Sequence, residues 1–183
     1  MDSSSEPVWD CRWPDPVALR VSAERILRNL PAEDPRLNRR LTTTVHPESD
    51  DNPAGVASAL LVTPWAVERV WWHSASRGEV PPIRHAFVLE ADDAGRVAAG
   101  QGVLLDLGEN RLVPVVVAWE PETGHYFVET LLHHTEGFDS VPEAVAVALG
   151  APPSASPRLS ITATFNQAVS RRGLLGFWRR GAS

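Results

Sequence analysis

The side chains best suited to bind a metal ion are three histidines in one predicted strand: His125, His133 and His134. His125 and His133 have the same parity along that strand, so both could project from one face of a sheet. Eight residues separate them by roughly 26 Å, at about 3.3 Å per residue, which is too far for one ion. We interpret them as surface or strand-end residues. A small metal-binding enzyme that uses these histidines or Cys11 is kept as an alternative.

The other candidate catalytic groups lack the surroundings that chemistry needs. Cys11 is the only cysteine, so no internal disulfide and no multi-cysteine metal site can form. It lies in a segment that we expect to be flexible, with no supporting residues around a nucleophile. Paired acidic residues such as Asp92 and Asp93 lie in predicted turns, where carboxylates are normally solvated. The chain has no lysine, which excludes a Schiff-base or phosphate-loop lysine. We therefore predict a non-enzyme that carries no metal and no cofactor.

Tryptophans are unusually frequent, with seven in the chain, and three of them cluster. Thr63 and Pro64 can cap and begin a helical turn, so we favour a helical turn over a strand for the residues after Trp65. Adjacent helical residues lie about 100° apart, so Trp71 and Trp72 could not both be buried on one side. At least one of them is then exposed or covers another element. Exposed tryptophan is typical of a protein-binding surface. Tryptophan that covers the second face of the sheet is the alternative interpretation.

The C-terminal segment combines arginines with apolar side chains. Such a segment could dock on a partner, with the arginines binding carboxylates and the apolar side chains entering a groove. A basic tail without such a role is the alternative. The candidate docking residues are Arg171, Arg172, Leu174, Leu175 and Trp178.

Periodicity predicts one helix near each end of a run of strands. Asp15 and Pro16 can begin a helix over 16–30, and the Ser140-to-Glu143 capping box can begin another over 141–149. The predicted strands are 56–62, 83–91, 101–108, 113–120 and 125–134, with a further short strand possible at 41–45. Tight turns between strands make them antiparallel. We predict an α+β fold: a single antiparallel sheet of about five strands with helices packed on one face.

Length and charge limit the classes of protein to which the chain can belong. The chain has 183 residues, which we divide into a flexible arm (1–14), one α+β domain (15–150) and a Pro/Ser linker with an Arg-rich tail (151–183). Its net charge of −6 argues against binding to nucleic acid or to an anionic membrane. It contains no secretory signal and no apolar run long enough for membrane insertion. These features predict a cytoplasmic protein, and a homo-oligomer is left open.

Two motifs resemble the HybE/HupJ family of NiFe-hydrogenase assembly chaperones. In that family an apolar strand opened by glycine runs into Thr-Pro-Trp, as Gly55 and Leu61-Val62-Thr63-Pro64-Trp65 do here. The segment SRRGLLG at 170–176 is similar to the family's Ser-Arg-Arg-x-Leu-x-Gly ending. An N-terminal amphipathic helix, as expected at 16–30, fits the family's layout. The resemblance implies a small α+β fold with helices on an antiparallel sheet, in a non-catalytic maturation factor.

The resemblance also implies a partner. A chaperone of this family would bind a hydrogenase subunit precursor in the cytoplasm, and we favour the small subunit with its twin-arginine leader. The net negative charge would complement such a basic leader. A non-catalytic accessory subunit, stably bound to a hydrogenase or another redox complex, is the main alternative. Besides the C-terminal residues above, the predicted partner-binding residues are Thr63, Pro64, Trp65, Trp71 and Trp72.

Overall fold

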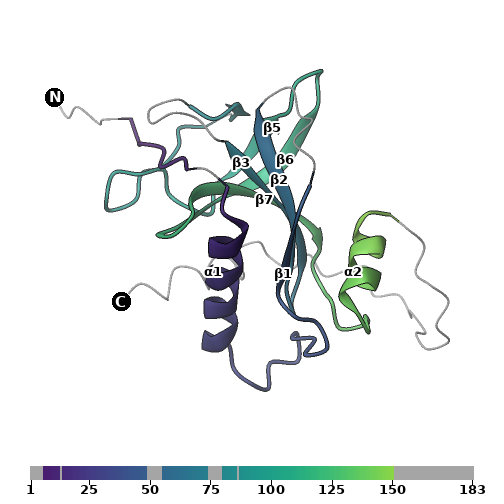
Figure 1. Ribbon diagram of the computed structural model, residues 1–183. Coiled ribbons are helices and arrows are strands. Elements are labelled where there is room, and N and C mark those ends of the chain that lie inside the picture. The colour runs from purple at the N-terminus through teal and green to yellow at the C-terminus, as the bar shows by residue number, and fades with distance from the viewer. Residues whose placement is uncertain (1–5, 13, 49–54, 74–79, 86, 151–183) are drawn as a thin grey trace.

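The computed structural model describes residues 6–12, 14–48, 55–73, 80–85 and 87–150, and shows two helices flanking a twisted sheet (Figure 1). The helices are α1 (Pro16–Asn29) and α2 (Val141–Ala148). The strands are β1 (Thr44–Pro47), β2 (Val56–Val62), β3 (Val67–His73), β4 (Ile83–Arg84), β5 (Gly102–Asp106), β6 (Leu112–Glu120) and β7 (Gly124–Leu132). Neither helix has the length and apolar character needed to cross a membrane.

All seven strands form one antiparallel sheet in the order β1-β2-β3-β7-β6-β5-β4. This confirms the predicted α+β class and single antiparallel sheet, but the sheet is larger than the five strands expected. Beyond the five, β1 lies at one edge, where a short strand over 41–45 was predicted as possible, and β3 lies in the middle. The strand predicted over 83–91 is only two residues long, as β4.

The residues after Trp65 form strand β3, so the predicted helical turn is wrong. β3 pairs with β2 on one side and with β7 on the other. Its sequence is VERVWWH, rich in the β-branched and aromatic residues that fit a half-buried pleated surface. Two hydrogen-bonded neighbours outweigh the weak local preference of Thr63-Pro64 for starting a helix.

Both predicted helices form, and side chains cap their first turns. In α1, the Asp15 carboxylate accepts hydrogen bonds from the backbone N–H groups of Val17 and Ala18, both at 3.0 Å. In α2, the Ser140 hydroxyl accepts from the Glu143 N–H at 3.4 Å. These bonds satisfy N–H groups that the helix itself leaves without partners. The two capping signals in the sequence therefore located the helix starts correctly.

The helices lie on opposite faces of the sheet, and the prediction that they share one face is wrong. Leu19 of α1 packs in a cluster with Leu61, whereas Ala144 of α2 packs in a cluster with Val62. Leu61 and Val62 are neighbours in β2, and neighbouring strand residues point to opposite faces. Figure 1 shows α1 and α2 on either side of β1. Each face of the sheet is thus covered over part of its area.

Residues 6–12, within the segment 1–14 that we predicted to be flexible, pack against the sheet domain. Val8 forms a parallel β-bridge with Arg96, and the Trp9 side chain is only 8% exposed. Trp9 packs edge-on against His125, with ring centroids 5.1 Å apart, and belongs to the apolar cluster on the α2 face. The arm therefore completes the core on the face that α1 does not cover.

Candidate functional site

The Thr-Pro-Trp motif is a tight turn that joins β2 to β3. The Thr63 hydroxyl oxygen accepts a hydrogen bond from the Ala66 N–H at 3.0 Å, and Thr63 is completely buried. The Pro64 carbonyl accepts bonds from the Asn38 N–H at 2.7 Å and from the Thr135 hydroxyl at 2.6 Å. Pro64 is also buried, while Trp65 is half-buried. Thr63 and Pro64 thus hold three parts of the chain together, and Trp65 is the one residue of the motif with a partly accessible side chain.

Trp71 and Trp72 are both interior. They are adjacent in β3 and point to opposite faces, Trp71 into the cluster with Trp9 and Phe127 and Trp72 into the cluster beneath α1. Their exposed fractions are 4% and 1%. Of the two interpretations, tryptophan covering both faces of the sheet agrees with the structure. A partner could contact these two indoles only if the elements that cover them moved away.

The predicted C-terminal binding residues, Arg171, Arg172, Leu174, Leu175 and Trp178, lie outside the described part of the chain. The prediction that they bind a partner therefore rests on the sequence pattern alone.

One half of the sheet presents apolar side chains that the described elements leave accessible. Leu104 and Leu112 are 40% and 39% exposed, Pro114 is exposed, and Val116 and Val128 are half-buried. We call these five residues the open apolar face. Leu104 lies opposite Pro114 in the β5–β6 pair, and Val116 lies opposite Val128 in the β6–β7 pair.

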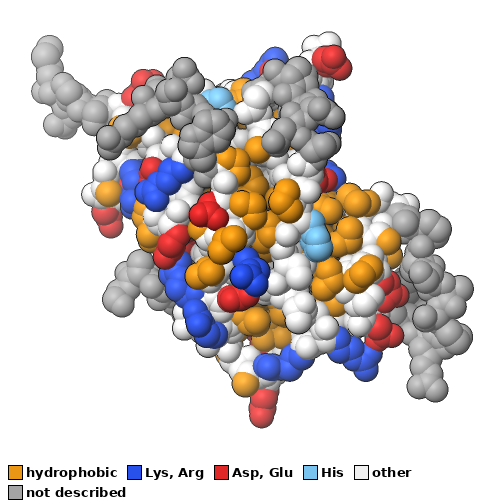
Figure 2. All heavy atoms as spheres, viewed as in Figure 1, with side chains coloured by type: hydrophobic (Ala, Val, Ile, Leu, Met, Phe, Trp, Pro, Cys, Tyr) orange, Lys and Arg blue, Asp and Glu red, His pale blue; other side chains and the backbone are white. Residues whose placement is uncertain are grey.

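The open apolar face continues the side of the sheet on which α1 packs. Ala118 belongs to the cluster beneath α1 and has the same parity in β6 as Val116 and Pro114. An antiparallel sheet with one side in water normally alternates apolar and polar residues. Here β5 and β6 are apolar at most positions on both sides. Figure 2 shows that hydrophobic side chains gather in patches on the visible surface, among acidic and basic ones.

Acidic side chains border this face. Glu68 lies on it in β3, opposite Thr130 of β7, and desolvation raises the pKa of its carboxyl to about 7. Asp106, at the end of β5, forms an ion pair with Arg84 at 2.6 Å. Burying an apolar chain here would bring any attached arginine close to carboxylates, which favours charge-assisted hydrogen bonds.

A partly buried ion pair links α1 to the sheet beside the same face. The Arg25 guanidinium donates to the Glu120 carboxylate at 2.5 Å, and Glu120 is only 7% exposed. Burial raises the pKa of Glu120, although Arg25 partly opposes that shift. Arg25 also lies 3.4 Å from Glu122. This pair joins the middle of α1 to the last residue of β6.

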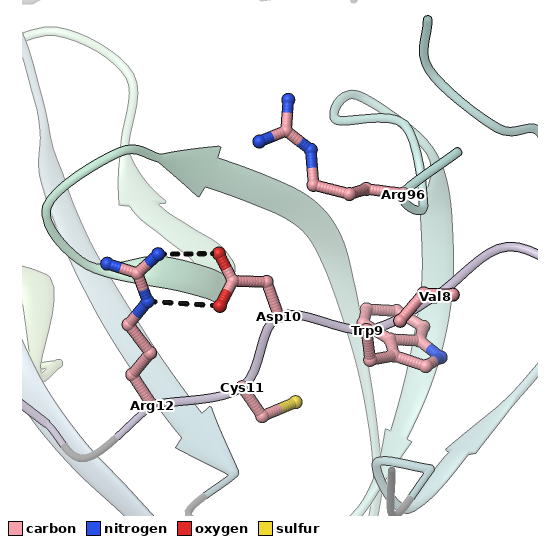
Figure 3. A pocket seen from close by; sticks show the side chains of 6 residues that line it. All are labelled: Val8, Trp9, Asp10, Cys11, Arg12 and Arg96. Atoms are coloured by element: carbon pink, nitrogen blue, oxygen red, sulfur yellow. Dashed lines mark hydrogen bonds and ion pairs between the residues drawn. The ribbon is translucent and has the colours of Figure 1, made fainter. Parts of the chain in front are cut away.

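A hollow in the described surface lies beside the N-terminal arm (Figure 3). It has a volume of about 560 Å³ and is lined by Val8, Trp9, Asp10, Cys11, Arg12 and Arg96. Figure 3 shows the Asp10–Arg12 ion pair on one side, with Arg96 apart from it. Burial, followed by the charge of Asp10, raises the pKa of the Cys11 thiol to about 11. Cys11 is therefore protonated at neutral pH, which is the unreactive form.

The histidines do not gather. His125 is 2% exposed, which contradicts the surface position we expected, and it contacts the N-terminal arm. His134 lies at the surface, 3.6 Å from Glu136. Within the described ranges, no three His, Cys, Asp or Glu side chains are close enough together to hold a metal ion.

Sequence reasoning missed the open apolar face. The signal was present in VPVVVAWE, where apolar residues occupy both parities of the strand and leave no polar side. A strand buried on both faces gives the same pattern, so the sequence could not show which side stays accessible.

In three comparisons with known proteins, no family model, no curated protein and no solved structure matches this chain. The likeness to the HybE/HupJ family therefore stays a prediction from the two motifs.

Proposed function

We propose that this protein is a non-catalytic assembly factor that binds a NiFe-hydrogenase subunit precursor in the cytoplasm, with the small subunit and its twin-arginine leader as the favoured client. The observation that carries this proposal is the open apolar face with its acidic border. The two sequence motifs shared with the HybE/HupJ family support the choice of client.

The binding mode follows from the chemistry of the two surfaces. A twin-arginine leader joins a pair of arginines to an apolar stretch. The apolar stretch would pack on Leu104, Leu112 and Pro114, and each Å² of apolar surface removed from water contributes about 25 cal/mol. The arginines would lie near Asp106, whose carboxylate already accepts from Arg84, and near Glu68, whose raised pKa of about 7 would fall as an arginine approached and favoured its charged form. Only part of this gain appears as affinity, because ordering a flexible leader costs entropy. Such binding is reversible, as an assembly factor requires.

The first prediction tests this mode with the full-length protein and a fluorescent synthetic leader peptide. We expect Leu112→Glu to weaken binding by at least about tenfold, because it places a charge where apolar side chains would pack. Leu149→Glu is the matched control, since Leu149 is 53% exposed at the end of α2, away from the face. Its affinity should equal that of the unmodified protein.

Fluorescence anisotropy measures all three affinities, and circular dichroism checks that each variant is folded. Equal weakening by both variants would show that the contact is not at this face. No binding of the leader to the unmodified protein would exclude the leader as the client segment.

The alternative function, an accessory subunit, also agrees with an exposed apolar surface, because a stably bound enzyme could bury that surface. The two functions differ in what stays bound. An accessory subunit purifies with the mature enzyme, whereas an assembly factor purifies with the precursor that still carries its leader. Affinity purification from the native host, with bound subunits identified by mass, separates them.

A further inference from the structure

We propose that the connection between α1 and β1 forms a binding site for a small aliphatic carboxylate, such as octanoate. The apolar chain of this ligand enters a pocket beside the connection, and its carboxylate binds Arg28 and Arg39, which line the same pocket. The site shares no residue with the open apolar face, so the inference goes beyond the proposed function.

The pocket lies where α1 ends and the chain turns back toward the sheet (Figure 1). At about 30 Å³ for each water-sized group, its volume of about 310 Å³ holds roughly ten non-hydrogen atoms. Six of its lining side chains are apolar: Leu27, Leu30, Ala32, Leu37, Leu41 and Pro64. Pockets for small molecules are mostly apolar, with a few polar groups that orient the ligand. The size and lining therefore fit a small ligand with an apolar chain.

A proline and two short turns build one wall of the pocket. α1 ends because Pro31 restricts Leu30 to an extended conformation, which Leu30 adopts with ψ 144. Two turns follow, in which the Asp34 N–H donates to the Pro31 carbonyl and the Leu37 N–H donates to the Asp34 carbonyl, both at 3.1 Å. These turns place Leu37 in the lining of the pocket, together with side chains from the last turn of α1.

Asn38 fixes this connection to the rest of the molecule. It is buried, and its backbone N–H donates to the Pro64 carbonyl at 2.7 Å. Its side-chain amide donates to the carbonyls of Thr135 and Phe138, at 2.6 and 2.7 Å. Pro64 of the Thr-Pro-Trp motif is itself part of the pocket wall. The wall is therefore held in place without a ligand, and a preformed site loses less entropy on binding.

The four arginines of residues 27–41 fall into two pairs. Arg36 forms an ion pair with Asp34, and Arg40 forms one with Asp139. Neither of these two arginines lines the pocket, whereas the other two do. The arginines at the pocket are thus the ones whose charge a neighbouring carboxylate does not match.

Arg28 and Arg39 determine which head group the ligand carries. Among the residues that the structure describes, neither forms an ion pair with a carboxylate. Arg39 donates to the Ala32 carbonyl, which leaves other N–H donors of its guanidinium available. Residues 27–41 carry a formal charge of +2, four arginines against two acidic residues, which attracts an anion. Guanidinium groups match the two oxygens of a carboxylate, and this small head group leaves most of the volume to an apolar chain.

The test titrates the full-length protein with octanoate and with 1-octanol, which has the same chain length but no charge. Isothermal titration calorimetry measures both affinities at concentrations below micelle formation. The disrupting variant is Arg28→Gln/Arg39→Gln. Its matched control is Arg36→Gln/Arg40→Gln, which removes the same formal charge from the same stretch but from residues outside the pocket lining. Circular dichroism checks that each variant is folded.

We expect the unmodified protein to bind octanoate at least about tenfold more tightly than 1-octanol, because only octanoate accepts charge-assisted hydrogen bonds. Arg28→Gln/Arg39→Gln should weaken octanoate binding by at least about tenfold and change the 1-octanol affinity by less than about twofold. The control variant should keep both affinities. No octanoate binding to the unmodified protein, equal affinities for the two probes, or equal weakening by the two double variants would each overturn the proposal.

Leu112→Glu separates this site from the open apolar face. The variant should keep the octanoate affinity of the unmodified protein, although it weakens leader binding under the proposed function. Loss of octanoate binding in Leu112→Glu would place the probe on the open apolar face and overturn the pocket assignment. Octanoate binding that depends on Arg28 and Arg39, with no leader binding by any variant, would support this inference and exclude the leader as client.

Discussion

At the scale of single residues, the buried ring of His125 links the N-terminal arm to the segment around Val97 through its two ring nitrogens. The Asp10 N–H donates to Nδ1 at 2.7 Å, and Nε2 lies 2.9 Å from the Val97 carbonyl oxygen. A ring that accepts at Nδ1 and donates at Nε2 is neutral. Burial is the main reason that the pKa of His125 lies below its usual value, and nearby Arg96 adds to the effect, whereas Asp10 and Asp92 oppose it. A protonated ring would lose the bond from Asp10.

We expect His125 to make the fold less stable in acid. Because its pKa is lower in the folded state, the unfolded chain binds the proton more readily, and stability is lost as pH falls below about 6.5. His125→Gln cannot titrate, so its stability should fall less between about pH 7.5 and pH 5. At the higher pH it should be about 1–3 kcal/mol less stable, because buried hydrogen bonds are lost. Urea denaturation at several pH values measures both quantities, and an equal fall in both proteins would contradict the assignment.

At the scale of elements, the turn between β6 and β7 brings the arm and the sheet into close contact. Gly124 has φ +68, a conformation that side chains disfavour, and a Cβ there would lie 2.3 Å from the backbone oxygen of Asp10. Arg12 crosses the same turn and donates to the Pro121 carbonyl at 2.6 Å. The arm therefore lies directly on this turn, and only glycine leaves room for it.

Gly124→Ala should detach or displace the arm. We expect a loss of about 2–5 kcal/mol, the sum of left-handed backbone strain and the collision with Asp10. Gly95→Ala is the matched control, because Gly95 has φ +75 but nothing within 4 Å of the added Cβ. It should cost only about 1–2 kcal/mol.

Urea denaturation gives the two free energies of unfolding, and alkylation of native Cys11 reports release of the arm. Only Gly124→Ala should increase Cys11 reactivity. Similar losses of stability in both variants would mean that backbone strain alone matters and that the arm is not held by this contact.

At the scale of the whole molecule, charge is distributed unevenly along the chain. The N-terminal 150 residues carry a formal charge of −11 and the remainder carries +5. Long-range attraction between unlike charges speeds association and weakens as salt screens it. A basic client would therefore be attracted to the acidic residues 1–150, and its binding would depend on ionic strength.

Leader binding should accordingly weaken as salt rises. Between about 50 mM and 500 mM NaCl we expect at least about a fivefold loss of affinity for the twin-arginine peptide. A peptide with both arginines replaced by glutamine should bind more weakly at low salt and show little salt dependence. Anisotropy titrations provide the comparison, and identical salt dependence for the two peptides would show that the arginines make no electrostatic contact.

The sequence by itself determined where the two helices begin and that the strands form an antiparallel sheet. Asp15 and the Ser140-to-Glu143 box located the helix starts, because capping depends on residues only two or three positions apart. Apolar runs separated by turn residues were enough to predict an antiparallel sheet. The amino-acid composition also determined the negative formal net charge of the chain, which does not depend on the fold.

Only the tertiary structure decided which side chains remain accessible. Trp71 and Trp72 became interior because β3 pairs with strands on both sides and because the arm and α1 cover opposite faces. Leu104 and Leu112 stayed accessible because neither cover extends that far. Whether a side chain is covered depends on contacts between residues far apart in the chain. The sequence does not distinguish an apolar residue that is packed against another element from one that is exposed.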